Sequence, residues 1–237
     1  MRSPIITTSV TQSIVQDLGA GIVTGRFSDA AFPSESALCE HYGAARTVVR
    51  EAVKMLVAKG LISTRPRQGI RIAQEHDWNL FDPDVLRWLL ERKFSMKLLV
   101  EFTQIRLDVE PGAAALAALN ATAEDRRDIS RAIERMYAAE NGDDDPLSAD
   151  IEFHVSVLKA SGNRFYLQLR EMISTALHVS IQRTNKLKGV HRASARDHDK
   201  VAKAILSGDP VAARKAMFDL IQGVFALMGE DTAGYVK

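Results

Sequence analysis

Three side chains in the second half of the chain have the types and spacing of metal ligands. Asp150 and His154 lie four residues apart, so on a helix both project from one face. Apolar residues recur at helical offsets around His154 and His198, so we expect both imidazoles to face the interior. One carboxylate and two imidazoles that converge suit a divalent transition ion such as zinc. The alternative is that they are ordinary core histidines.

Arg106 is also expected to face the interior, because it lies in a stripe of apolar residues at helical spacing. A buried guanidinium is costly unless an anion pairs with it. That anion is either Glu110, one turn further on, or the carboxylate of a small ligand. Arg183 is a further cation that such a ligand could contact. The residues expected to bind the effector are therefore Arg106, Asp150, His154, Arg183 and His198.

A different chemistry is indicated near the N-terminus. Arg46, Thr47, Arg50 and Lys54 recur at intervals of three or four residues, so they share one face of a helix whose other face is apolar. Arg can donate to O6 and N7 of guanine, and Lys and Thr can bind phosphates. Taken alone, the pattern also fits a surface helix with solvated cations.

The flanking segments favour DNA binding. Ser34 is a candidate N-cap and Gly43 a candidate C-cap of a short preceding helix, which gives a helix-turn-helix with the second helix as reader. After Gly60 the sequence predicts strands at 61–65 and 70–72 that form a basic hairpin, or wing. The wing residues expected to contact DNA are Arg65, Arg67, Gln68 and Gly69.

The charge distribution supports this reading. Between Tyr42 and Ile72 there are seven basic residues against one acidic residue, Glu51, which is a local charge of +6 in a chain of net charge +1. Such a concentration is typical of a nucleic-acid contact surface. The basic residues are Arg46, Arg50, Lys54, Lys59, Arg65, Arg67 and Arg71.

Composition places the chain among globular proteins of a reducing compartment. It has 237 residues, 46% of them hydrophobic, and its single cysteine, Cys39, excludes an intrachain disulfide. No signal-peptide core and no uncharged run of membrane-spanning length is visible, so we expect a cytoplasmic protein that does not bind membranes.

The chain is predicted to be mainly α, with a winged helix-turn-helix at 1–76, a linker helix within 77–95, and an all-helical effector-binding and dimerisation domain at 96–237. We expect Trp78 and Trp88 to pack the linker helix between the domains rather than to bind a ligand. A first helix is predicted at 8–24. The expected bundle helices of a six- or seven-helix domain are 97–119, 123–140, 146–160, 164–186, 193–207 and 210–229.

The N-terminal motifs resemble the GntR family of bacterial transcription regulators. The matching residues are Phe32-Pro33-Ser34-Glu35, Leu38-Cys39-Glu40, Arg46-Thr47-Val48-Val49-Arg50-Glu51-Ala52, Gly60-Leu61-Ile62 and Arg67-Gln68-Gly69. The resemblance implies that Arg46, Thr47 and Arg50 read the operator. Ser36 is a departure, because the family often has Arg there; that contact is missing or is made by Lys54.

The C-terminal motifs resemble the FCD effector domain of FadR-type regulators. The matching residues are Asp150-Ile151-Glu152-Phe153-His154, Asp197-His198, residues 204–209 and the Arg106-x-x-x-Glu110-Pro111 element. The resemblance implies a metal held by one Asp and three His, which helps to bind a carboxylate. Leu220 stands where the third His is expected, which leaves a three-ligand site completed by water or effector, or no metal.

These features predict a homodimeric repressor of a sugar-acid catabolism operon, released from double-stranded operator DNA by a small carboxylate. Residues 78–90 resemble the linker of galactonate-responsive regulators, which implies galactonate or a related aldonate. The alternative is a metal-dependent, all-α phosphohydrolase of the HD type, built on His198-Asp199 with Asp150 and His154. That alternative lacks convincing further ligands and leaves the basic segment unexplained.

Overall fold

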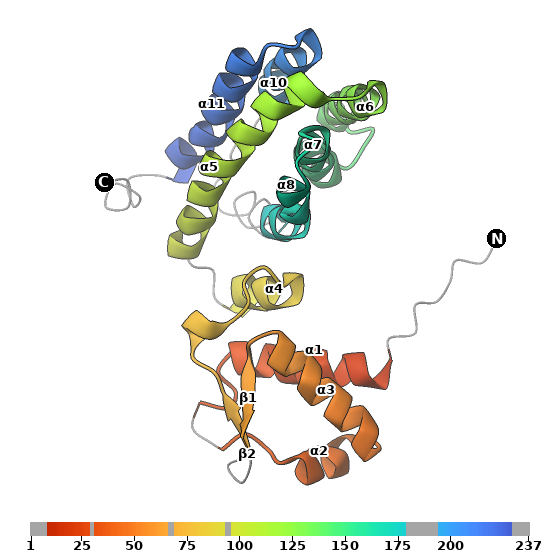
Figure 1. The fold of residues 1–237 in the computed structure, drawn as a ribbon, viewed down its shortest axis with the longest axis vertical. Coiled ribbons are helices and arrows are strands. Elements are labelled where there is room, and N and C mark those ends of the chain that lie inside the picture. Colours follow the sequence, from red (N-terminus) through yellow and green to blue (C-terminus); the bar gives the residue numbers. More distant parts are fainter. Residues whose placement is uncertain (1–8, 29–30, 66–68, 93–95, 179–193, 229–237) are drawn as a thin grey trace, which may run out of the picture. The chain divides into compact units, whose positions relative to one another are not determined.

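The structure is a computed structural model that describes residues 9–28, 31–65, 69–92, 96–178 and 194–228 (Figure 1). The chain divides into two compact units, Met1–Lys93 and Phe94–Lys237, and each is described by itself. Within the described ranges, no helix is long and apolar enough to cross a membrane. The fold is mainly α, with a two-stranded sheet in the first unit and a helical second unit, as the sequence predicts.

The first unit is a winged helix-turn-helix followed by one more helix. Ser34 caps α2, its hydroxyl accepting a hydrogen bond from the backbone N–H of Ala37, and Gly43 ends α2 in the left-handed conformation at φ 58°. The antiparallel strands pair Ile62 with Ile72 and Arg65 with Gly69. Its elements are α1 (Val10–Val23), α2 (Glu35–Tyr42), α3 (Arg46–Ala58), β1 (Ile62–Arg65), β2 (Gly69–Ile72), η1 (Glu75–Asp77) and α4 (Pro83–Arg92).

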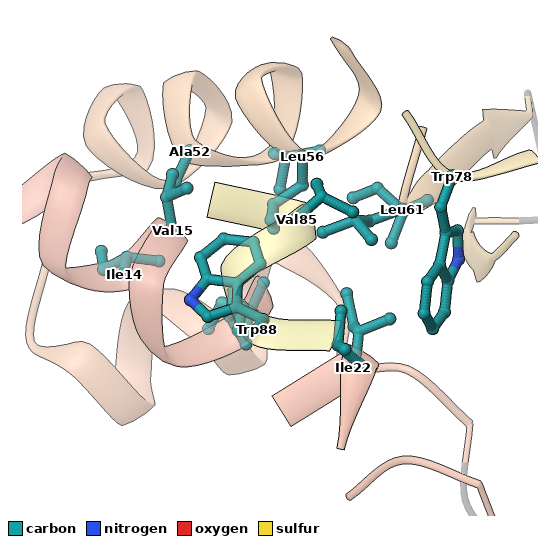
Figure 2. Close-up of a cluster of buried hydrophobic side chains, with 14 of the residues drawn as sticks. Ile14, Val15, Ile22, Ala52, Leu56, Leu61, Trp78, Val85 and Trp88 are labelled. Atoms are coloured by element: carbon teal, nitrogen blue, oxygen red, sulfur yellow. The ribbon is translucent and has the colours of Figure 1, made fainter. Parts of the chain in front are cut away.

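The core of this unit includes α4. Figure 2 shows Trp88 of α4 among apolar side chains from α1 and α3, with Val85 beside Leu56. The Trp88 ring packs directly on the backbone of α1, because a Cβ atom built at Gly19 would lie 2.3 Å from two of its ring carbons. Trp78 and Trp88 are both buried in this core, whereas the sequence predicted that they pack a linker helix between the domains.

A partly buried ion cluster fixes the start of α4. The Lys59 ammonium donates to both carboxylate oxygens of Asp82 at 2.8 Å and to Asp84 at 2.9 Å. Asp84 also accepts from the Gln16 amide of α1 at 3.1 Å. Burial alone would lower the pKa of Lys59, but its hydrogen bonds to the two carboxylates outweigh that effect and raise it. The described part of the predicted linker therefore packs as part of the first unit.

The second unit is a helical bundle in which α5 packs along α11 and α7, and α6 along α7 and α10. Thr122 and Asp125 form a capping box at the start of α6, and Pro146 follows the N-cap Asp145 of α7. Its elements are α5 (Met96–Asn120), α6 (Ala123–Glu140), α7 (Pro146–Ala160), α8 (Arg164–Gln168), a helix over residues 170–178, α10 (Ala195–Ser207) and α11 (Pro210–Met228).

One predicted helix differs from the structure. The helix expected at 164–186 is interrupted at Leu169, where the backbone N–H bonds back to the carbonyls of Tyr166 and Leu167 and ends α8. A second helical segment follows over 170–178, and the remainder of the predicted helix lies outside the described residues. The stretch contains no Gly or Pro at the break, so periodicity alone gave no signal for it.

The contact between Gly19 and Trp88 predicts a specific loss of stability. We expect Gly19→Ala to reduce the free energy of unfolding of the first unit by about 1–2 kcal/mol, because overpacking outweighs the gain in helix propensity. Tryptophan fluorescence during urea unfolding measures this, since Trp78 and Trp88 both lie in this unit. Gly223→Ala is the control, because its added Cβ would meet nothing within 4 Å. Equal effects of the two substitutions would contradict the packing described.

Candidate functional site

The predicted DNA-contact residues of α3 share the exposed face of that helix. Arg46, Thr47, Arg50 and Lys54 are all exposed. The opposite face is buried against the core of the first unit, which fixes the direction of the cations. Its buried residues are Val49, Ala52, Val53 and Leu56.

Two of these cations are paired with carboxylates at the surface. The Nε atom of Arg50 lies 3.1 Å from a carboxylate oxygen of Glu35 on α2, and the Arg50 side chain is 60% exposed. Lys54 pairs with Glu51, one turn back on α3, at 3.3 Å. Both remain open to an approaching phosphate or base, since exposed ion pairs of this kind contribute little to stability.

The wing places Arg65 and Gly69 opposite each other at its tip-side end. Both residues are exposed, and Gly69 has φ 75°, a left-handed conformation that favours glycine. The predicted contacts Arg67 and Gln68 lie outside the described residues. The two wing positions that the structure describes are accessible, as a DNA contact requires.

The second unit contains a buried charge cluster. Arg106 and Glu110 on α5 form an ion pair in which Nε lies 2.5 Å from a carboxylate oxygen, and the side chains are only 5% and 1% exposed. His154 on α7 joins them, with Nδ1 at 2.5 Å from the other Glu110 oxygen and Nε2 at 3.1 Å from Arg106 Nη2. Of the two anions considered for Arg106, the structure shows Glu110 in contact with it.

Asp150 extends this cluster to a third helix. Its Oδ1 atom lies 3.3 Å from His154 Nε2 and 3.0 Å from Nε2 of His198 on α10. The structure thus brings together the carboxylate and the two imidazoles that the sequence singled out, with one ligand atom from each within 4.8 Å of the others. Phe153 packs edge-on against both imidazole rings.

The donor set fits a divalent metal ion with three protein ligands. Nδ1 of His198 donates to the backbone carbonyl of Ser194 at 3.1 Å, and Nδ1 of His154 faces Glu110. Outer hydrogen bonds of this kind orient the imidazoles of metal sites. Nε2 of both imidazoles faces Asp150, and Nε2 of His154 also lies 3.1 Å from Arg106 Nη2, so a bound ion would replace the contact with Arg106. Leu220, at the place of the expected third His, is buried and cannot ligate. Three ligands leave an open position for water or an effector.

The charges in the cluster stabilise one another. Burial alone would raise the pKa of Glu110, but attraction to Arg106 and His154 outweighs it and lowers the pKa to about 2. Burial likewise opposes the charge of Asp150, and its hydrogen bonds to His154 and His198 lower its pKa strongly. For His154, burial is the largest effect and lowers the pKa, but the Glu110 and Asp150 carboxylates together raise it, and the net shift is upward.

Sequence reasoning missed how this cluster is connected. The contact from Glu110 to His154 spans 44 positions, and the Ser194 carbonyl that orients His198 is a backbone group. Neither leaves a signal in the spacing of residue types. Arg183, the remaining predicted effector contact, lies outside the described residues.

Two family models match the chain. The model of bacterial regulatory proteins of the gntR family matches residues 10–72, and the model of the FCD domain matches residues 101–223. The chain belongs to the GntR family and has an FCD domain. It is therefore a transcription regulator with a DNA-binding helix-turn-helix and an effector-binding domain, as the sequence predicts.

Curated relatives of this GntR-family protein are regulators too. It is 34% identical to the galactonate operon transcriptional repressor of Escherichia coli K12, over 76% of this chain and 79% of the relative. It is 28% identical to the transcriptional regulator LutR of Bacillus subtilis, over 81% and 91% of the two chains. Because the matching families and relatives are regulators, the phosphohydrolase alternative has no support.

Solved structures share the fold. McbR/YncC of E. coli is similar with a TM-score of 0.53 and 19% identity, over 94% of this chain and 98% of the other. Lar of Listeria monocytogenes is similar with a TM-score of 0.58 and 15% identity, over 93% and 96%. At these identities the likeness concerns the fold alone.

The buried Arg106–Glu110 pair on α5 predicts that loss of its carboxylate destabilises the second unit far more than loss of a surface carboxylate does. Glu110→Gln should lower the free energy of unfolding of the second unit by about 3–5 kcal/mol, because it leaves the Arg106 charge buried without its anion. Asp219→Asn is a matched control, since Asp219 also pairs with a cation four residues away, Lys215, but at the surface. It should change stability by at most about 0.5 kcal/mol. Urea unfolding followed by circular dichroism measures both, and similar small values would contradict the cluster.

Proposed function

We propose that this GntR-family protein is a cytoplasmic homodimer that represses genes of sugar-acid catabolism and leaves its operator when a small carboxylate binds. The observation that carries the proposal is the combination of an exposed cationic face on α3 with the buried Arg106–Glu110–His154 cluster. The first supplies phosphate and guanine contacts, and the second a polar, charged site inside a bundle. The galactonate operon repressor, at 34% identity, supports galactonate or a related aldonate.

The α3 face fits a DNA major groove in this proposal. Arg46 and Arg50 read base edges, Thr47 and Lys54 bind phosphates, and the wing residues Arg65, Arg67, Gln68 and Gly69 contact the adjoining backbone or minor groove. Two copies of the reader helix read the two halves of a palindromic operator, as the symmetry of a dimer requires.

The buried cluster provides a place for the carboxylate. Arg106 uses Nε and Nη2 toward Glu110 and His154, and among the described residues Nη1 has no hydrogen-bond partner. A guanidinium has five donors, so an acid can pair with the remaining edge of Arg106 without removing Glu110. Arg183 is proposed as a second contact to the same ligand.

A divalent ion, zinc being our expectation, would be held by Asp150, His154 and His198. When bound, it would supply a positive charge and an open coordination position that suits the carboxylate and neighbouring hydroxyl of an aldonate. Asp150 contacts both imidazoles.

Release from DNA requires that the acid prefer one arrangement of the two reader helices. An effector that binds both arrangements equally shifts no population, however tightly it binds. Because α4 is part of the core of the first unit, a movement of α4 would carry the winged helix with it. We propose that effector binding acts on the operator through this helix.

The DNA contact is tested with a duplex selected from a random library by the wild-type protein. Arg50→Ala should weaken binding to this duplex by about 1–3 kcal/mol, the value of one bidentate Arg–guanine contact. Lys215→Ala, which removes an exposed cation from the second unit, should leave affinity unchanged. Fluorescence anisotropy at several salt concentrations measures both. Unchanged affinity of Arg50→Ala would refute the placement of α3 on DNA.

The effector is tested by titrating galactonate and other aldonates into the same complex. We expect at least one acid to release the duplex, whereas the neutral sugar galactose does not, because only the acid can pair with Arg106. Repeating the titration after chelator treatment and after zinc addition shows whether release depends on the ion. If no aldonate releases DNA with or without zinc, the proposed effector class is wrong.

A further inference from the structure

Arg50 is the one proposed base-reading residue whose guanidinium is held by a residue of another helix. Glu35 is the first residue of α2, and its Oε2 atom accepts from Arg50 Nε at 3.1 Å. Ser34 caps the same turn through the Ala37 N–H, which fixes the backbone of Glu35. The carboxylate is therefore anchored on a helix separate from the one that carries Arg50.

This contact restricts how Arg50 can approach a base. Guanine O6 and N7 can be bound by Nε with one Nη group, or by the two Nη groups end-on. Glu35 occupies Nε, and among the described residues the Nη groups of Arg50 have no partner. Only the end-on approach keeps both the protein contact and the two contacts to the base.

We propose that Glu35 is a specificity-determining residue of this regulator, which holds Arg50 by Nε so that its two Nη groups are presented together to one guanine. The inference rests on the DNA contact proposed above. A side chain held in its binding geometry loses less rotamer freedom on binding. It also binds phosphates and other bases less well, because swinging away breaks the pair with Glu35.

A neighbouring ion pair gives a contrast within the same surface. Glu51 pairs with Lys54 at 3.3 Å on α3 itself, and both side chains are more than half exposed. An ammonium is a point charge without a fork geometry, so Glu51 cannot orient it toward one base. Ser36, where a further arginine was expected by resemblance, instead lies 3.0 Å from the Ser34 hydroxyl. Among the described residues, Arg50 is the side chain that Glu35 contacts.

Glu35 is expected to improve discrimination between DNA sequences while lowering the affinity for DNA in general. Its negative charge lies next to Arg50 on the proposed DNA-contact surface, so removing it should strengthen binding to unrelated DNA while weakening discrimination. A residue that only stabilises the fold would lower binding to every duplex alike. The affinity for unrelated DNA and the preference for the selected duplex, measured together, therefore separate a role in specificity from a role in folding.

The experiment selects duplexes from a random-sequence library with the full-length wild type and with Glu35→Ala, Glu35→Gln, Glu51→Ala and Arg50→Ala. Each variant's thermal unfolding is measured in parallel. Arg50→Ala identifies the base pair that Arg50 reads. We expect Glu35→Ala to lose preference at that same base pair by about fivefold or more, out of the roughly 5- to 150-fold that a bidentate contact supplies.

Glu51→Ala removes the same charge from the same surface and should keep the wild-type preference. Glu35→Gln retains an oxygen acceptor for Nε of Arg50 and should keep most of the wild-type base preference. If Glu35→Ala selects the wild-type motif unchanged, or if Glu51→Ala loses the preference equally, the inference is overturned. If the wild type itself enriches no motif, the proposed DNA-binding function fails instead.

Discussion

A guanidinium inside a helical bundle must have an anion, and much of the second unit's organisation follows from how Arg106 obtains one. Glu110 pairs with it on α5, His154 joins Glu110 from α7, and Asp150 connects His154 to His198 on α10. The charges are thus shared across three helices. Such a cluster is a poor source of stability compared with apolar packing. Its presence in the bundle is explained if it binds an anion.

The first unit uses arginine in the opposite way. Its cations on α3 stay at the surface, where exposed pairs contribute little to stability and leave the cations accessible. The apolar face beneath them is shared with α1 and α4, and the Lys59 pair with Asp82 and Asp84 ties α4 to the end of α3. The helix that precedes the second unit in the sequence therefore packs in the same core as α3.

Much of this was predictable from residue types. The caps Ser34 and Gly43, the apolar faces and the short wing all follow from local rules, which is why most predicted helices agree with the structure within two residues. The four-residue spacing of Asp150 and His154 also placed them on one face. The break at Leu169 and the Glu110–His154 contact were not predictable, because tertiary packing rather than local spacing decides them.

The pairing of Lys59 with Asp82 and Asp84 was missed for the same reason. The charge pattern placed Lys59 among the seven basic residues of the proposed DNA-binding segment. In the structure its ammonium is buried against α4. Charge patterning shows that cations gather in a segment and does not show which of them face solvent.

The central claim is that the buried cluster is retained to bind a carboxylate rather than to stabilise the bundle. The most direct measurement is on the double variant Arg106→Met with Glu110→Met, which removes both charges together. We predict a free energy of unfolding at least equal to the wild type, since apolar replacement of a whole buried pair is often neutral or stabilising. We also predict that calorimetry shows no binding of the aldonate that releases wild-type protein from DNA. A double variant that still binds this acid with wild-type affinity would contradict the account.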